Sequence, residues 1–254
     1  MKKPIVALIY DFDGTLAPGN MQEFGFIQAL GETKEEFWEK SNSLAVDQDA
    51  SDVLSYMKMM YDEARTKGIS LRREDFGRFG RGIDFFEGVR EWFSLVNAYG
   101  AEHGVRVEHY INSSGLKEMI EGTVIAREFK HIFAGTYIYN AEGVAVWPGI
   151  AVDYTNKTQF LFRIHKGALG ISDERINEET PDDQIYVPYT RMVYMGDGMT
   201  DVPCMSLVRR YGGTSIAVYS GAHSPAKKLF DEKRVNFIAP ADYTEGSPVD
   251  TIAK

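Results

Sequence analysis

The sequence predicts an α/β protein, with a three-layer core of parallel sheet covered by helices on both faces and a helical segment inserted into it. Three observations predict this fold. Residues 5–10 are apolar and partly β-branched, as in a strand buried on both faces. Beyond residue 86, strand-like and helix-like segments alternate, which is typical of such a sheet. Residues 20–79, in contrast, carry helical patterns and no convincing strand.

The inserted segment contains two clear helix signals. Thr33 and Glu36 form a capping box ahead of an aromatic pair, which predicts a helix start. A second helix is predicted by apolar residues at helical spacing, and Gly68 follows it as a plausible stop. Those apolar residues are Val53, Leu54, Met57, Met60, Tyr61 and Ala64.

The remaining elements follow from the same patterns along the chain. Val89, Trp92, Phe93, Val96 and Tyr99 mark an amphipathic helix that Gly104 ends. We expect helices over residues 86–103, 116–125, 155–169, 200–211 and 222–232, strands over 105–112, 192–195 and 214–219, and a hairpin over 137–146 with its turn at 140–143. Residues 244–254 are expected to form a surface tail.

Composition limits the class of protein. A chain of 254 residues with 44% hydrophobic content is long enough for a large core with a smaller insertion. The net charge of −9 disfavours a nucleic-acid or anionic-membrane surface, and no stretch approaches the length of a membrane span. Cys204 is the single cysteine, so no intrachain disulfide can form and a reducing, cytoplasmic location is expected. The oligomeric state stays open.

Two carboxylates, Asp11 and Asp13, follow the first strand directly, and Gly14 then lets the chain turn. Side chains alternate along a strand, so both acids point toward the same cleft beyond the carboxyl edge of the sheet. Carboxylates held this close repel one another unless a cation or a shared proton compensates. The pair therefore indicates Mg²⁺, or one nucleophile beside one acid/base, although a simple Asx-type turn is the alternative.

Three further polar groups follow later strands, where a parallel sheet places its ligand. Ser113 is expected at a strand-to-helix junction and suits a phosphate oxygen, although a serine there can also just cap the helix. Lys157 lies early in a predicted helix, where a cation opposes the helix dipole and indicates a nearby negative group. Asp197 and Asp201 flank a helix start in Gly-Asp-Gly-Met-Thr-Asp, and Asp197 is a natural ligand for a hard cation.

The elements Asp-x-Asp-Gly-Thr, Ser, Lys and Gly-Asp-Gly-x-Thr-Asp, in this order, resemble the four motifs of the haloacid dehalogenase superfamily. The resemblance spans nearly the whole chain and implies a Rossmann-like core. It implies that Asp11 is the nucleophile that becomes an aspartyl-phosphate and that Asp13 is the acid/base. Ser113, with Ser114 and Gly115, and Lys157 would bind the phosphoryl group. Asp11, the backbone carbonyl of Asp13, and Asp197 would hold Mg²⁺, with Asp201 in support.

The resemblance also implies a helical cap domain in the insertion. Residues 18–84 would form the cap, and residues 1–17 and 85–254 the core. Cap size and spacing most resemble the phosphoserine phosphatase-like branch. That branch usually carries a glutamate about nine residues after the nucleophile, where this chain has Asn20, with Glu23 further on. Asn20, Glu23, Met57 and Arg81 are the cap residues expected to point inward.

The expected function is therefore Mg²⁺-dependent hydrolysis of a small phosphorylated metabolite whose identity the motifs do not fix. A phosphomutase that returns the phosphoryl group to a sugar carries the same motifs and is the enzyme alternative. A phosphate-binding or regulatory protein without turnover is the alternative from another class, since a fold does not guarantee activity.

Overall fold

A seven-stranded sheet forms the centre of the computed structural model, which describes residues 3–221 and 224–254. The strand order is β4-β3-β2-β1-β5-β6-β7, and every neighbouring pair is parallel except β3 and β4. The strands are β1 (Ile5–Tyr10), β2 (Arg106–Leu116), β3 (Phe129–Tyr139), β4 (Ala145–Ile150), β5 (Met192–Gly196), β6 (Thr214–Tyr219) and β7 (Phe237–Pro240). The predicted α/β class is confirmed, and β1 lies at the middle of the sheet.

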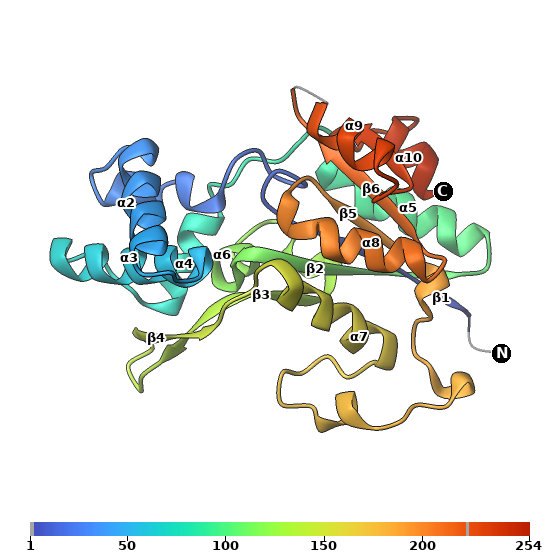
Figure 1. Cartoon of the computed structure of the whole chain (residues 1–254), viewed down its shortest axis with the longest axis horizontal. Helices are drawn as coiled ribbons and strands as arrows, with labels where there is room; N and C mark the ends of the chain where they lie inside the picture. The colour runs from blue at the N-terminus through green and yellow to red at the C-terminus, as the bar shows by residue number, and fades with distance from the viewer. Residues whose placement is uncertain (1–2, 222–223) are drawn as a thin grey trace.

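Helices cover both faces of the sheet, and β1 shows why (Figure 1). Leu8 and Tyr10 face one hydrophobic cluster together with α5 (Val89–Glu102) and α10 (Pro248–Ala253). Ala7 and Ile9 face a second cluster, formed with α7 (Thr158–Lys166), α8 (Val202–Arg210) and α9 (Ser224–Asp231). The strand is apolar throughout because each of its faces is buried under a helical layer.

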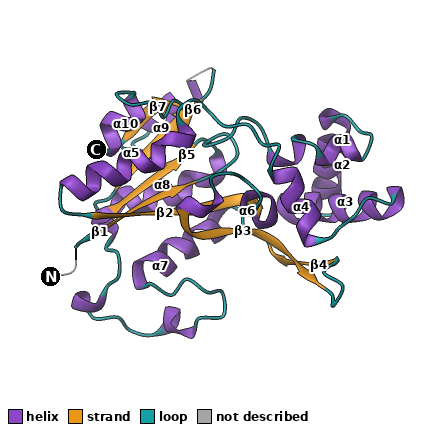
Figure 2. Ribbon diagram, turned by 180° about the vertical axis from the view of Figure 1, so that it is seen from behind, coloured by secondary structure: helices purple, strands orange, loops and turns teal. Residues whose placement is uncertain are grey.

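Four helices between β1 and α5 lie together beside one end of the sheet, as Figure 2 shows. They are α1 (Phe26–Ala29), α2 (Lys34–Asp47), α3 (Asp52–Lys67) and α4 (Arg73–Gly80). Thr33 caps α2 through the predicted capping box, and α3 ends at Gly68 in the left-handed conformation, also as predicted. Helix α4 packs closely on α6 (Lys117–Glu121). The contact requires glycine at position 80, since a Cβ there would lie 1.9 Å from the Met119 carbonyl oxygen.

The two ends of this helical segment meet. The Phe86 N–H donates to the Leu16 carbonyl oxygen at 3.0 Å, and the rings of Phe12 and Phe85 pack edge to face. The chain therefore leaves the sheet layer and returns to it at neighbouring points.

Several elements differ from the sequence expectation. Strand β2 runs on through residues 113–116, β3 begins eight residues before the predicted hairpin, and β7 was not predicted. Residues 222 and 223 of the predicted helix 222–232 lie outside the described residues, and α9 covers most of the rest. Among the described helices, none combines the length and apolar character that crossing a membrane requires.

The expected surface tail at residues 244–254 is wrong. Ser247 caps α10, and Val249 and Asp250 are buried. Just before it, the buried Tyr243 hydroxyl donates to the Thr15 carbonyl oxygen at 2.9 Å. A helix of six residues carries too short a pattern for its apolar face to stand out in the sequence.

Candidate active site

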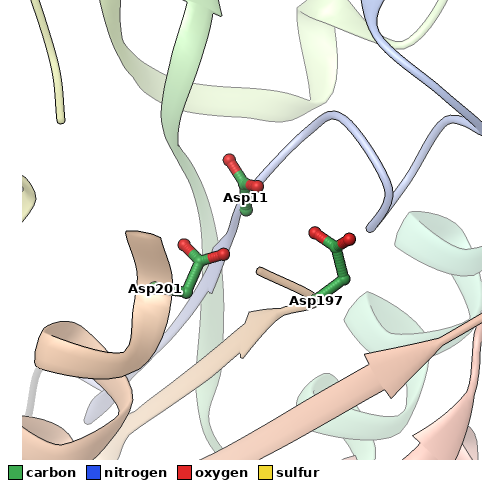
Figure 3. A group of neighbouring side chains, drawn as sticks. All are labelled: Asp11, Asp197 and Asp201. Atoms are coloured by element: carbon green, nitrogen blue, oxygen red, sulfur yellow. The ribbon is translucent and has the colours of Figure 1, made fainter. Parts of the chain in front are cut away.

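Three carboxylates converge at the carboxyl edge of the sheet. Asp11 follows β1, Asp197 follows the neighbouring β5, and Asp201 precedes α8. Figure 3 shows these side chains gathered around one point, and one oxygen from each lies within 4.8 Å of the others. Such a set of oxygens is suited to a hard divalent cation.

Lys157 lies under this group of carboxylates. It is fully buried, at the end of the 3₁₀ turn Tyr154–Lys157 that precedes α7. Its Nζ is 3.1 Å from Asp11 Oδ1 and 2.7 Å from Asp201 Oδ1. The negative neighbours expected from its place at a helix start are thus present.

Both carboxylate oxygens of Asp201 accept hydrogen bonds. Besides Lys157, its Oδ1 accepts a hydrogen bond from the Tyr194 hydroxyl at 2.8 Å, and its Oδ2 accepts one from the Gly198 N–H at 3.3 Å. An acid with both oxygens engaged is fitted to position its neighbours.

Burial and neighbouring charges shift the pKa values of Asp11, Asp197 and Lys157. Burial, and then the charge of Asp201, raise the pKa of Asp11 to about 8, although Lys157 opposes this. The pKa of Asp197 is raised to about 6 by burial of its carboxyl and then by the charge of Asp201. Burial acts against the charge on Lys157, but Asp11 and Asp201 raise its pKa above its ordinary value. When ionised, the three converging carboxylates together therefore carry more negative charge than one lysine balances.

Asp13 lies apart from the three converging carboxylates but faces the same cleft. Its Oδ1 accepts a hydrogen bond from the Met21 N–H at 2.9 Å. Burial, and then the charge of Asp11, raise the pKa of Asp13 well above its ordinary value. Asp13 therefore keeps its proton to a higher pH than an ordinary carboxyl, as a general acid must.

Ser113, Ser114 and Gly115 lie within β2, so the predicted junction with a helix is wrong at this point. Helix α6 begins later, after Leu116, with no side-chain cap, so neither serine caps it. The Ser113 Oγ accepts a hydrogen bond from the Gly115 N–H at 3.0 Å, which leaves its own proton free for a ligand. The Ser114 Oγ is buried in the cleft wall without a partner.

Gly14 shapes the turn between the two motif acids and Thr15. Its φ of +73° favours glycine, and a Cβ there would lie 2.2 Å from Asp197 Oδ2. Thr15 Oγ1 donates to Asp197 Oδ1 at 3.4 Å. The glycine thus makes room for one of the three converging carboxylates.

We predict that Gly14→Ala weakens the binding of a divalent cation by the three converging carboxylates by about tenfold or more, because Asp197 must move aside. Gly31→Ala is the matched control, since Gly31 has a φ of +72° but nothing within 4 Å of an added Cβ. Both variants bear the cost of a left-handed alanine, about 1–2 kcal/mol. Mg²⁺ titration of both separates the two effects, and an equal shift would contradict the prediction.

A cleft of about 280 Å³ opens above these groups, toward α2 and α3. Asn20 lines it, as expected, but Glu23, Met57 and Arg81 do not. Met57 is buried, and Glu23 Oε1 accepts hydrogen bonds from Asn20 and Trp38. The lining residues that sequence reasoning missed are Gln22, Trp38, Asn42, Asp52, Val53, Tyr56, Asp153, Tyr154 and Thr200. Five of them reach the cleft because α2 and α3 pack beside the sheet, which no local pattern marks: Trp38, Asn42, Asp52, Val53 and Tyr56.

Comparison with known proteins gives a consistent family. The family model for haloacid dehalogenase-like hydrolases matches residues 8–206. An uncharacterized protein of Borreliella burgdorferi is 30% identical, over 97% of this chain and 94% of its own length.

Solved structures share the fold. A phospho-aspartyl intermediate analogue of phosphoserine phosphatase matches with a TM-score of 0.59 and 15% identity, over 99% of this chain and 98% of its own. A HAD family hydrolase of Salmonella enterica serovar Typhi matches with a TM-score of 0.59 and 17% identity, over 89% of this chain and 66% of its own. The matched region of the family model includes all the polar groups of the cleft edge described above. The chain belongs to the haloacid dehalogenase-like hydrolase family.

Proposed function

We propose that the protein is a Mg²⁺-dependent phosphatase that hydrolyses a small phosphomonoester through an aspartyl-phosphate on Asp11. The observation that carries this proposal is the placement of two different carboxyl groups in one cleft. The pKa of both carboxyls is raised, but Asp11 pairs at 3.1 Å with the Lys157 ammonium, whereas Asp13 has no ion pair among the described residues and accepts a hydrogen bond from the Met21 N–H. One group is fitted to attack and the other to carry a proton.

The donor set fits Mg²⁺. Asp11 and Asp197 would be ligands, with the backbone carbonyl of Asp13, and Asp201 would support them. The pKa values of Asp11 and Asp197 are raised by burial and then by the charge of Asp201, which Lys157 offsets only in part. The ion, when bound, offsets charge on the carboxylates and on the transferring phosphoryl group. Asp13 would contribute no side-chain oxygen to it.

In the first step, an oxygen of Asp11 attacks phosphorus and the bond from phosphorus to the ester oxygen breaks. Asp13 gives its proton to that oxygen, so the product leaves as a neutral alcohol. Lys157 favours the ionised form of Asp11, against the burial and the acidic neighbours that raise its pKa, and balances phosphoryl charge. The hydroxyls of Ser113 and Ser114 donate hydrogen bonds to the phosphoryl oxygens.

In the second step, Asp13 takes a proton from a water molecule whose oxygen attacks the phosphorus of the aspartyl-phosphate. The bond between phosphorus and Asp11 breaks and inorganic phosphate leaves. Asp13 regains its proton and Asp11 its charge, so each turnover restores the starting state.

We also propose that residues 18–84 form a cap domain over a core made of residues 1–17 and 85–254. The hydrogen bond between Leu16 and Phe86 supports these limits, because it joins the chain where the helical segment begins and ends. The Tyr56 hydroxyl of α3 donates to the Ser114 carbonyl oxygen at 2.7 Å. The cap would therefore close over the phosphoryl site and exclude water that the reaction does not use.

Hydrolysis of p-nitrophenyl phosphate tests the proposed function. We expect phosphate release that requires Mg²⁺, stops with EDTA and returns when Mg²⁺ is restored in excess. Mg²⁺ should also raise the melting temperature of the protein, since it binds the folded state. Activity that persists in EDTA would contradict the metal requirement.

The same measurement separates the alternatives. Isomerisation of a sugar phosphate without phosphate release would favour a phosphomutase. Absence of release from a broad panel of phosphomonoesters, with Mg²⁺ binding intact, would favour a protein that binds phosphate without turnover.

A further inference from the structure

We propose that the alcohol released by this enzyme carries an ammonium group and no carboxylate. This inference rests on the proposed function and concerns the part of the substrate that is not phosphate. The far wall of the cleft, formed by Gln22, Trp38, Asp52, Tyr56, Asp153 and Tyr154, carries the argument.

The far wall is negatively charged. Asp52 begins α3 and Asp153 precedes the turn that carries Lys157. The Ser51 hydroxyl donates to Asp153 at 2.8 Å, and Asp52 has neither an ion pair nor a side-chain hydrogen bond within the described ranges. None of the described residues that line the cleft is a lysine, arginine or histidine. A cationic group would therefore find two carboxylates there and no competing cation.

The aromatic residues of the far wall offer their rings. The Trp38 indole N–H already donates to Glu23 at 2.9 Å, and the Tyr56 hydroxyl already donates to the Ser114 carbonyl oxygen. Tyr56 is buried and packs edge to face on Trp38, so a ligand meets mainly the half-buried Trp38 ring. Tyr154 adds a half-exposed ring and holds a φ of +29°, a backbone conformation rare for a bulky residue. Aromatic faces bind organic cations.

Gln22 supplies a directional contact. It is only 1% exposed, yet it lines the cleft, and its Oε1 has no hydrogen-bond partner. A buried acceptor of this kind is costly unless a ligand or water meets it. Gln22 follows Met21, whose N–H holds Asp13, so it lies near the point where the alcohol leaves. An ammonium N–H would supply the donor that this oxygen lacks.

A carboxylate on the substrate, in contrast, would meet only acids, amides and rings. It would lose its hydration without gaining a cation, which disfavours binding. The cleft therefore distinguishes between two phosphomonoesters that share an amine and differ in a carboxylate.

Three probes test the inference: phosphoethanolamine, propyl phosphate of nearly the same shape without the charge, and O-phosphoserine with the added carboxylate. We expect kcat/KM for phosphoethanolamine to exceed each of the other two by about tenfold or more. A value for propyl phosphate or O-phosphoserine equal to that for phosphoethanolamine would overturn the inference. So would a hexose phosphate that is preferred to phosphoethanolamine.

Substitution of Asp52 tests whether the far wall causes the preference for phosphoethanolamine. Asp52 is exposed to solvent, so Asp52→Asn should lower the ratio of kcat/KM for phosphoethanolamine over propyl phosphate by about threefold. Asp47→Asn removes the same charge from an exposed position at the end of α2, outside the cleft, and should leave the ratio unchanged. Equal ratios in the two variants would contradict the assignment to Asp52.

The proposed function and this inference fail in different ways. If the proposed function is wrong, the protein does not hydrolyse p-nitrophenyl phosphate in the presence of Mg²⁺. In that case, calorimetric binding of phosphoethanolamine and propyl phosphate to the unaltered protein with Mg²⁺ still decides the inference. Tighter binding of phosphoethanolamine supports it, and equal or weaker binding overturns it.

Discussion

Asp11→Asn is expected to lower phosphatase activity by at least about four orders of magnitude and to make the metal-free protein more stable. The loss of activity follows because an amide does not attack phosphorus to form the acyl-phosphate. The gain in stability follows from burial, since the Asp11 carboxyl is enclosed and close to Asp201. The contact of Lys157 with Asp201, 2.7 Å in the unaltered protein, does not involve Asp11 and should persist in the variant.

The direction of the pH effect follows from the pKa of Asp11, which is raised to about 8 in the folded protein. The pKa of an aspartate in the unfolded chain is about 4, so the folded state binds the extra proton between these two pKa values. Stability of the metal-free protein therefore falls as pH rises through this window. Asparagine does not titrate, so the variant escapes that loss.

Melting temperatures in EDTA at about pH 5 and about pH 8 measure this difference. The advantage of Asp11→Asn should be larger at the higher pH, and the stabilisation by added Mg²⁺ should be smaller than in the unaltered protein. Asp47→Asn, an exposed change of the same kind, should match the unaltered protein in activity and melting temperature. Retained turnover in Asp11→Asn would exclude Asp11 as the nucleophile.

Lys157→Met is expected to destabilise the protein by about 3–5 kcal/mol and to reduce activity at least about 100-fold. Methionine has a similar length, but it leaves Asp11 and Asp201 buried without their cation. Removing one partner of a buried ion pair costs more than the pair contributes. The phosphoryl oxygens also lose a positive neighbour.

The stability deficit of Lys157→Met should shrink as pH falls. Without the lysine, the folded-state pKa of Asp11 rises further, so the deficit is largest at high pH and is relieved where Asp11 is protonated. Denaturant unfolding in EDTA at about pH 5 and about pH 8 tests this. Lys228→Met, on an exposed lysine of α9, should unfold like the unaltered protein. A deficit that is independent of pH would indicate lost packing alone.

The core of the fold and the approach of its polar groups were predictable because both depend on local pattern. The apolar run before Asp11 marks a central strand, and side chains at the carboxyl ends of parallel strands must meet. The prediction that Asp11 and Asp13 face one cleft is confirmed. Asp13 nevertheless stands apart from the three converging carboxylates, because the chain turns tightly from Phe12 to Ala17.

The far wall of the cleft was not predictable from local pattern. Asp52 is an ordinary first-turn acid of a helix, and Trp38 belongs to an ordinary packing face. Both reach the cleft only through the placement of α2 and α3 beside the sheet, where the Tyr56 hydroxyl of α3 donates to the Ser114 carbonyl oxygen. Ser114 was expected beside a helix start, but β2 continues past it, since pairing with β3 extends to Leu116.

The hydrogen bond between Leu16 and Phe86 has a consequence for protein engineering. A segment whose two ends meet at one backbone contact can be exchanged without changing the distance that the flanking chain must span. Chimeras that keep Asp11, Lys157 and Asp197 but graft another helical segment between these points would alter selectivity and leave the phosphoryl chemistry in place. The same arrangement gives evolution a route by which specificity diverges while the catalytic scaffold is preserved.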